Sequence, residues 1–262
     1  MLVRKTSLAA TLMLATAAHA GTVMESLNRD LAGDRAESVT TTYAQAGQMR
    51  VESGTSDSFL IFKDDTLYSI SRKDRSYVAM DRATLKKMID QISPVMKQMQ
   101  ERLAKMSPEQ RAQMERMMGR KMPGMGQNSV QEIRKTARAG NVGGYSCNYV
   151  EVVEGGVLSS ELCVVNPAAL KGGEELMNAA LKMSALVQDM LKGMDAPWLR
   201  QTIDRQVENY SRIGGVPVLS RHYSDGKAAN ETTIKSIRAQ ALPANTFEVP
   251  EGYSRKELGL PK

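Results

Sequence analysis

Residues 145–165, YSCNYVEVVEGGVLSSELCVV, favour a β-hairpin, and the fold class follows from this segment. Residues 145–153 and 157–165 are rich in β-branched and aromatic side chains, as strands are. Glu154-Gly155-Gly156 lies between them, and a short connection that contains glycine is typical of antiparallel strands. We therefore predict an antiparallel hairpin here.

The two cysteines of the chain, Cys147 and Cys163, lie one in each predicted strand. A three-residue loop centred on Gly155 places them opposite each other, within reach of a disulfide, whereas a two-residue turn would shift the register by one. We expect a disulfide, because an even number of cysteines in an exported chain favours one. Closing a loop of this size would stabilise the folded protein by about 3 kcal/mol. Two free thiols and a redox-active pair are the alternatives, and the absence of a C-x-x-C spacing disfavours the pair.

The same register assigns the two faces of the hairpin, because alternate residues of a strand share a face. One face carries only aliphatic residues: Val150, Val152, Leu158, Leu162 and Val164. The other face is more polar: Cys147, Tyr149, Glu151, Ser159 and Glu161. We expect the aliphatic face to pack in the core and the disulfide to lie on the wetter side.

Residues 1–20 are typical of a secretory signal peptide. Arg4 and Lys5 precede an apolar run, and Ala18-His19-Ala20 matches the small residues of a cleavage site. We predict cleavage after Ala20, a periplasmic location and a mature chain of residues 21–262, with a buried N-terminal helix as the alternative. No later stretch is apolar over the ~18 residues of a membrane span, so the mature chain is expected to lack a transmembrane segment.

The charge of the chain is mildly basic, with 35 Lys and Arg against 29 Asp and Glu. Cleavage removes Arg4 and Lys5 and lowers the net charge from +6 to +4. The basic residues are spread along the chain, whereas nucleic-acid binding requires clusters. We predict no nucleic-acid partner and no cofactor, and the sequence indicates no particular protein partner.

The rest of the mature chain reads as strands interrupted by two helical segments. Strands are predicted at 22–28, 38–43, 48–53, 58–62, 66–70, 76–80, 130–138, 216–223 and 232–240, with an extended tail at 243–253. Helical periodicity covers about 81–122 and 167–210. Consecutive hairpins imply an antiparallel sheet. We therefore predict a single α+β domain in which a large antiparallel sheet packs against helices from two insertions.

Methionine is abundant, with 18 residues in the chain, whereas aromatic residues make up only 5%. The apolar stripes of the two helical segments provide candidate residues for a ligand cavity: Met88, Ile92, Met96, Met99, Leu103, Met183 and Met190. Methionine side chains are flexible and polarizable, and they suit surfaces that adapt to apolar ligands. Ordinary core packing is the alternative interpretation of the same stripes.

A denser methionine cluster gives an alternative function: Met114, Met117, Met118, Met122 and Met125. Thioethers select Cu(I), so a Met-based copper-binding or envelope-stress protein is the second hypothesis. Residues 106–111 resemble the helix start of Spy- and CpxP-type periplasmic stress proteins, and a capping box from Ser107 to Gln110 accounts equally well for these residues.

Catalysis has little support in the sequence, and we predict that the protein is not an enzyme. His222 is the one histidine of the mature chain, so a Ser-His-Asp or Cys-His site would have to use it. The chain lacks the G-x-S-x-G, H-E-x-x-H, Walker and G-x-G-x-x-G patterns.

Several blocks in a fixed order carry a resemblance to a known family. They are QMRVE at 48–52, FLIF at 59–62, YVAM at 77–80, GGYSC at 143–147, ELCVV at 161–165, GVPV at 215–218 and LPANTFEVPEGY at 242–253. Together they resemble a family of uncharacterised exported bacterial domains related to the lipoprotein-carrier (Lol-type) half-barrel superfamily.

The resemblance implies an unclosed, barrel-like antiparallel sheet wrapped around helices. Carriers of that superfamily shield acyl chains in a cavity between sheet and helices. We therefore expect a periplasmic binding or carrier protein for an apolar ligand, an acyl chain or lipid, held between the sheet and Met-rich helices. The long segment 81–125 and the disulfide hairpin depart from the carriers, so lipoprotein delivery itself is not carried over.

Overall fold

The structure is a computed structural model that describes residues 20–33, 36–84, 131–192 and 212–257, together with scattered residues between 86 and 110. The predicted signal peptide lies outside the described residues, apart from Ala20. The predicted first insertion falls largely outside them as well. The second insertion contributes the 3-10 helix η1, Pro167–Ala169, and the helix α3, Gly173–Lys192.

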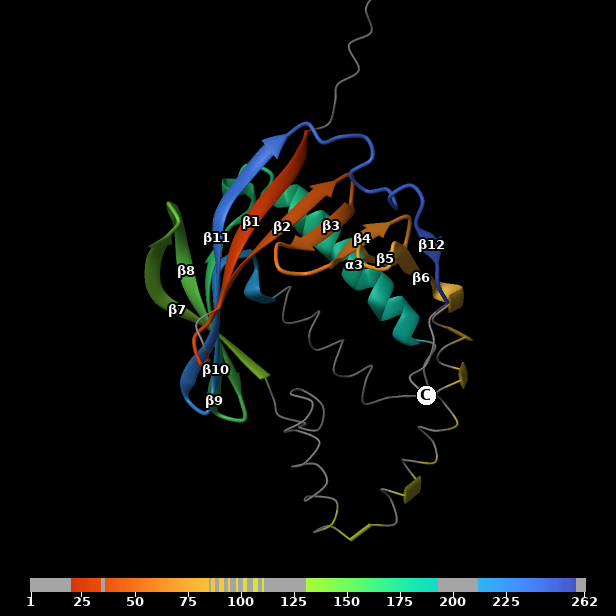
Figure 1. The fold of residues 1–262 in the computed structure, drawn as a ribbon. Coiled ribbons are helices and arrows are strands. Elements are labelled where there is room, and N and C mark those ends of the chain that lie inside the picture. Colours follow the sequence, from red (N-terminus) through yellow and green to blue (C-terminus); the bar gives the residue numbers. More distant parts are fainter. Residues whose placement is uncertain are drawn as a thin grey trace, which may run out of the picture.

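One sheet of 12 strands dominates the described part of the chain (Figure 1). The strands are β1 Gly21–Asp30, β2 Glu37–Gln45, β3 Gln48–Ser53, β4 Ser58–Lys63, β5 Thr66–Ser71, β6 Ser76–Met80, β7 Gln131–Val142, β8 Tyr145–Glu154, β9 Val157–Val165, β10 Val216–Ser224, β11 Lys227–Gln240 and β12 Ser254–Arg255. Their spatial order is β12-β6-β5-β4-β3-β2-β1-β11-β10-β9-β8-β7.

The sheet has two edges, β12 and β7, and does not close, which confirms the large unclosed sheet. Pairing of β1 with β11 joins the first meander to the second. The strictly antiparallel prediction is wrong at one place, because β12 runs parallel to β6. This exception arises because the chain returns to the β6 edge through a long tail instead of a hairpin.

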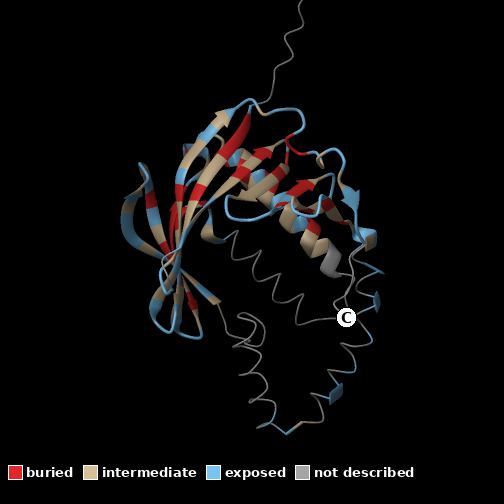
Figure 2. Cartoon of the chain, viewed as in Figure 1, coloured by how far each residue is buried: buried red, intermediate tan, exposed pale blue. Residues whose placement is uncertain are grey.

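Helix α3 covers the inner face of β1–β3, as Figure 1 shows. Ala44, Met49 and Phe62 form one cross-strand row that packs against the apolar side of the helix. Ala44 of β2 and Ala179 of α3 are fully buried. Their small side chains allow the helix to approach the sheet closely. Figure 2 shows that buried residues gather in the strands beside α3.

The start of α3 is fixed to β1. The Thr22 hydroxyl donates a hydrogen bond to the Gly172 carbonyl at 3.1 Å. Gly172 has a φ of +91°, and a Cβ atom there would lie 2.2 Å from the Thr22 hydroxyl oxygen. Only glycine therefore fits this approach without strain.

The C-terminal segment, residues 241–257, covers the outer face of β3–β6, and we name it the strap. Phe247 of the strap is buried against Phe59, Ile61 and Ile70. The predicted extended conformation of 243–253 is wrong, because the segment folds into successive turns, with the Thr246 amide donating to the Pro243 carbonyl at 3.0 Å. Proline presets φ for a turn and cannot donate to a strand ladder, which explains the difference.

The register of the β8–β9 hairpin differs from the prediction. Gly155 and Gly156 form a two-residue turn with φ angles of 57° and 84°, and Glu154 pairs with Val157. A bulge at Ser159 shifts the pairing by one further residue, so Cys163 lies opposite Tyr149. The predicted disulfide with Cys147 is nevertheless present, because the two Cα atoms are 5.4 Å apart across the diagonal.

The predicted faces of this hairpin are also wrong in one respect. Cys147 and Cys163 are 4% and 0% exposed and pack with Val165 and Val218, so the disulfide does not lie on a wet side. Leu162 forms a separate buried cluster with Val150 and Val164. Strand β9 lies between two other strands and is buried over Ser160–Val165, as expected for a strand covered on both faces.

Candidate functional site

A cross-strand row of apolar residues with one exposed member, Leu60, lies on the inner face of the sheet beside α3. Val51 pairs with Leu60, and Val78 continues the same cross-strand row through β5. This row lies on the face that carries Phe62, because alternate residues of a strand share a face. Leu60 is 40% exposed, although Phe62 two residues away is buried under α3.

Met183 of α3 contributes to the same surface. It is partly buried and packs against the cluster that also contacts Val51. We name Val51, Leu60, Val78 and Met183 the inner apolar strip. On the same helix, Leu181 is 47% exposed and lies about half a turn away from the buried Ala179.

Of the cavity residues predicted from sequence, Met183 alone has a described side chain. Met190 lies in α3. Five predicted cavity residues lie outside the described residues: Met88, Ile92, Met96, Met99 and Leu103. Sequence reasoning missed Met24 and Met49, which pack beside α3 from β1 and β3. Met49 lies between Gln48 and Arg50, and this alternation could have identified it, whereas Met24 follows the apolar Val23.

The alternative copper hypothesis is not tested by the described residues. Its five methionines lie outside them: Met114, Met117, Met118, Met122 and Met125. Among the described residues no group of three or more His, Cys, Asp or Glu side chains could hold a metal ion. Both cysteines are in the disulfide and therefore offer no thiolate.

His222 lies in β10 opposite Ser160 of β9. The Ser160 hydroxyl oxygen and the His222 Nδ1 atom are 2.8 Å apart, which makes a cross-strand hydrogen bond. On the other side of His222 lies Asn230 of β11. A nucleophilic triad needs a carboxylate that orients the imidazole, and no described carboxylate contacts His222.

A series of alternating charges crosses the sheet from β2 to β7, and sequence reasoning did not predict it. We name it the ion-pair ladder; in order its members are Glu37, Arg29, Glu231, Arg221, Glu161 and Arg138. The inner member Glu161 has a side chain only 9% exposed and accepts hydrogen bonds from both Arg138 and Arg221. Ionic pairing compensates the burial of this carboxylate.

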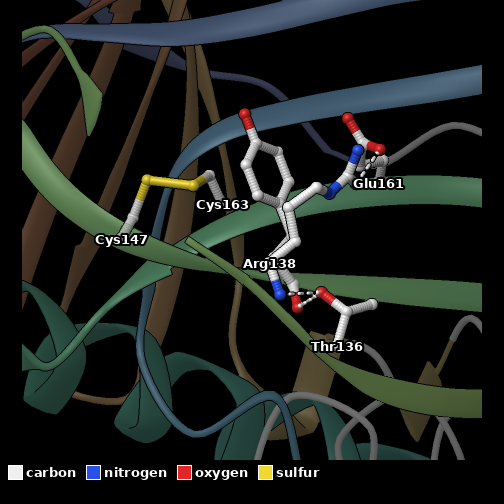
Figure 3. Close-up of a disulfide and its surroundings, with 6 residues drawn as sticks. Thr136, Arg138, Cys147, Glu161 and Cys163 are labelled. Atoms are coloured by element: carbon white, nitrogen blue, oxygen red, sulfur yellow. Dashed lines mark hydrogen bonds and ion pairs between the residues drawn. A yellow bond between two sulfur atoms is a disulfide. The ribbon is translucent and has the colours of Figure 1, made fainter. Parts of the chain in front are cut away.

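A wide bulge in β7 allows Arg138 to reach Glu161 (Figure 3). Residues 136–138 all lie opposite Tyr149, and the Thr136 hydroxyl donates to the Tyr149 carbonyl at 2.8 Å. The guanidinium carbon of Arg138 lies 4.0 Å from the centre of the Tyr149 ring. The hydrogen bond to Glu161 raises the pKa of Arg138 above its ordinary value. The bulge thus fixes a permanent cation on the aromatic ring.

None of the helices in the described residues has the length and hydropathy needed to span a membrane.

Comparison with known proteins gives no family. No family model and no curated protein matches the chain. An uncharacterised conserved protein from Thermus thermophilus is similar in structure, with a TM-score of 0.45, 8% identity, and coverage of 91% of this chain and 90% of that one. PNGF-II is similar with a TM-score of 0.35, 10% identity and coverage of 91% of this chain, which spans about a third (31%) of PNGF-II. Because both TM-scores lie below 0.5, we base no inference on these similarities.

Proposed function

We propose that this protein is an exported binding or carrier protein that holds an apolar ligand, an acyl chain of a fatty acid or lipid, against the inner face of its sheet. The observation that carries the proposal is the inner apolar strip, which is accessible on the same face that α3 otherwise buries. Leu60 is exposed and the other three members are half-buried, and a contiguous apolar row of this kind offers a ligand apolar contact. The resemblance to Lol-type carriers supports the same ligand class.

The energetics of such binding are favourable for a long chain. Burying a methylene group contributes about 0.8 kcal/mol, so ten methylenes contribute about 8 kcal/mol. Association costs roughly 4–15 kcal/mol in lost freedom of motion, so only ligands with long chains bind measurably. Met183 is partly buried at the strip, and its flexible side chain can adapt to chains of different shape.

A fluorescence titration with dansyl-undecanoic acid tests the proposal. Leu60→Glu places a carboxylate in the strip and is expected to weaken uptake at least tenfold. Val157→Glu is the matched control, because Val157 is 61% exposed at the tip of the β8–β9 hairpin. Failure of the wild-type protein to take up the probe, or equal uptake by both variants, contradicts the proposal.

Export to the periplasm is part of the proposal. Disulfides persist in oxidising compartments, and the Cys147–Cys163 disulfide is compatible with secretion. N-terminal sequencing of the protein recovered from a periplasmic extract is expected to begin at Gly21. Recovery of the uncleaved chain from the cytoplasm contradicts this part.

A further inference from the structure

An open hollow of about 600 Å³ lies on the outer face of the sheet, between β2, β3 and the strap. Its walls include Tyr43 and Arg50, which are cross-strand partners, and Glu52. These residues point to the face opposite Ala44 and Met49, so the hollow is separated by the sheet from the inner apolar strip. Small-molecule sites have volumes of about 300–1,000 Å³, and this hollow falls within that range.

The walls of the hollow are fixed by contacts within the protein. The Arg50 guanidinium donates to the Thr246 carbonyl of the strap at 2.9 Å and lies 4.3 Å from the centre of the Phe59 ring. Arg72 donates to Glu52 at 2.6 Å and lies over the same ring. Buried Phe247 holds the strap in place. A site formed in advance loses little entropy when a ligand binds.

The charges around the hollow are nearly balanced. Glu52 is paired with Arg50 and Arg72, and Glu248 is paired with Lys63. The hydrogen bond with Glu248 raises the pKa of Lys63, so the Lys63 ammonium group stays charged at neutral pH. Glu251 is the remaining carboxylate at the wall. A charged ligand therefore gains little from the electrostatic field of the site.

We propose that this hollow binds a neutral oligosaccharide, a function beyond acyl-chain binding. A sugar ring has an apolar C–H face and hydroxyl groups that both donate and accept hydrogen bonds. Tyr43 packs against the cluster of Phe59 and Ile61 and contributes an aromatic side chain to the wall of the hollow. Asn245 offers a donor and an acceptor, Glu251 offers an acceptor, and Arg50 offers donors. Groups that donate and accept hydrogen bonds beside an aromatic ring complement such a ligand.

Isothermal titration with three trisaccharides tests the ligand class. The probes are chitotriose, which is neutral, the trimer of glucosamine, which is cationic, and trigalacturonate, which is anionic. We expect chitotriose to bind at least tenfold more tightly than either charged trimer. A glycan array of neutral oligosaccharides without a single bound member, or tighter binding of a charged trimer, overturns the proposal.

Two variants locate the binding. Asn245→Ala and Glu251→Ala remove these two side-chain groups from the wall and are each expected to weaken chitotriose binding at least fivefold. Asn230→Ala, an exposed asparagine of β11, is the matched control and is expected to bind like the wild type. Uptake of dansyl-undecanoic acid should be unchanged in all three, which separates this site from the inner strip. Equal binding by Asn245→Ala and Asn230→Ala contradicts the assignment.

Discussion

The two halves of the sheet are held together by different interactions. Within strands β2–β6, α3 covers β2 and β3 on the inner face and the strap covers β3–β6 on the outer face, and their core contains large side chains such as Phe59, Phe62 and Ile70. Strands β7–β10 contain smaller valines, a disulfide and the inner part of the ion-pair ladder. Register shifts occur in the β7–β8, β8–β9, β9–β10 and β10–β11 pairs, and none in the pairs from β2 to β6.

This difference shows how one sheet is stabilised in two ways. Regular strands packed against a helix or the strap bury enough apolar surface to hold their register. Bulges interrupt the backbone ladder and leave carbonyl groups that side chains must satisfy, as Thr136 does for Tyr149. A covalent bond and buried ion pairs then fix the register in place of large side chains.

The largest expected loss of stability comes from a substitution in the half of the sheet that the strap covers. Phe247→Ala removes a side chain that is 6% exposed, and we expect a loss of about 3–5 kcal/mol in the free energy of unfolding. Urea denaturation measures this loss. The amide of Lys256, which donates to the Tyr77 carbonyl at 2.8 Å, should also exchange faster with solvent. A loss below about 1 kcal/mol would show that the strap does not stabilise this half.

In the other half, removing the disulfide should have the next largest effect. Cys147→Ala with Cys163→Ala opens a loop with a sequence separation of 16, and we expect a loss of about 3 kcal/mol. Reduction of the wild-type protein should lower its stability similarly, whereas a reductant should not affect the double variant. Unchanged stability of the double variant would contradict a stabilising role of the disulfide.

The ion-pair ladder provides a smaller test. Glu161→Gln removes a nearly buried carboxylate bonded to two arginines and is expected to destabilise by about 2 kcal/mol. Glu37→Gln, at the exposed end of the ladder, should change stability by less than about 0.5 kcal/mol. Equal effects in thermal unfolding would mean that burial does not strengthen the inner pairs.

The smallest expected effect concerns Asp81, which follows β6. The Thr84 amide donates to its carboxylate at 2.7 Å and lowers the pKa of Asp81 below its ordinary value of 3.8. Because the pKa is lower in the folded protein, this contribution is present above pH 3.8 and is lost as the pH falls through the folded pKa. Asp81→Asn should cost about 0.5 kcal/mol at pH 7 and nothing in strong acid. A difference that persists in acid would contradict this assignment.

Much of the fold was predictable because turn residues separate its strands. The ends of β3, β6 and β9 agree with the sequence, and the turn at Asp225-Gly226 lies where it was predicted. The register of β8 with β9 was not predictable, because nothing in the local pattern distinguishes the bulged Ser159 from its neighbours. The predicted register is off by one residue at the turn and by one more at the bulge, so the predicted cross-strand partners are wrong. The predicted disulfide is nevertheless confirmed.

The sites were less predictable, because their residues are distant in sequence. Arg138 meets Glu161 only through the β7 bulge, and Arg50 meets the strap across 196 positions of sequence. Helical periodicity identified Met183 as a candidate for the apolar surface. The sequence could not identify Leu60, because an apolar residue within a strand is usually buried. The exposure of Leu60 depends on how far α3 extends over the sheet.

The central claim, that an acyl chain binds on the inner face, is tested most directly by photo-crosslinking with a diazirine-labelled fatty acid followed by peptide mapping. We expect labelled peptides from β3, β4 and α3, among them the peptide that contains Leu60, and competition by unlabelled fatty acid. Labelling confined to the outer face and the strap, or labelling that unlabelled fatty acid does not reduce, would contradict the claim.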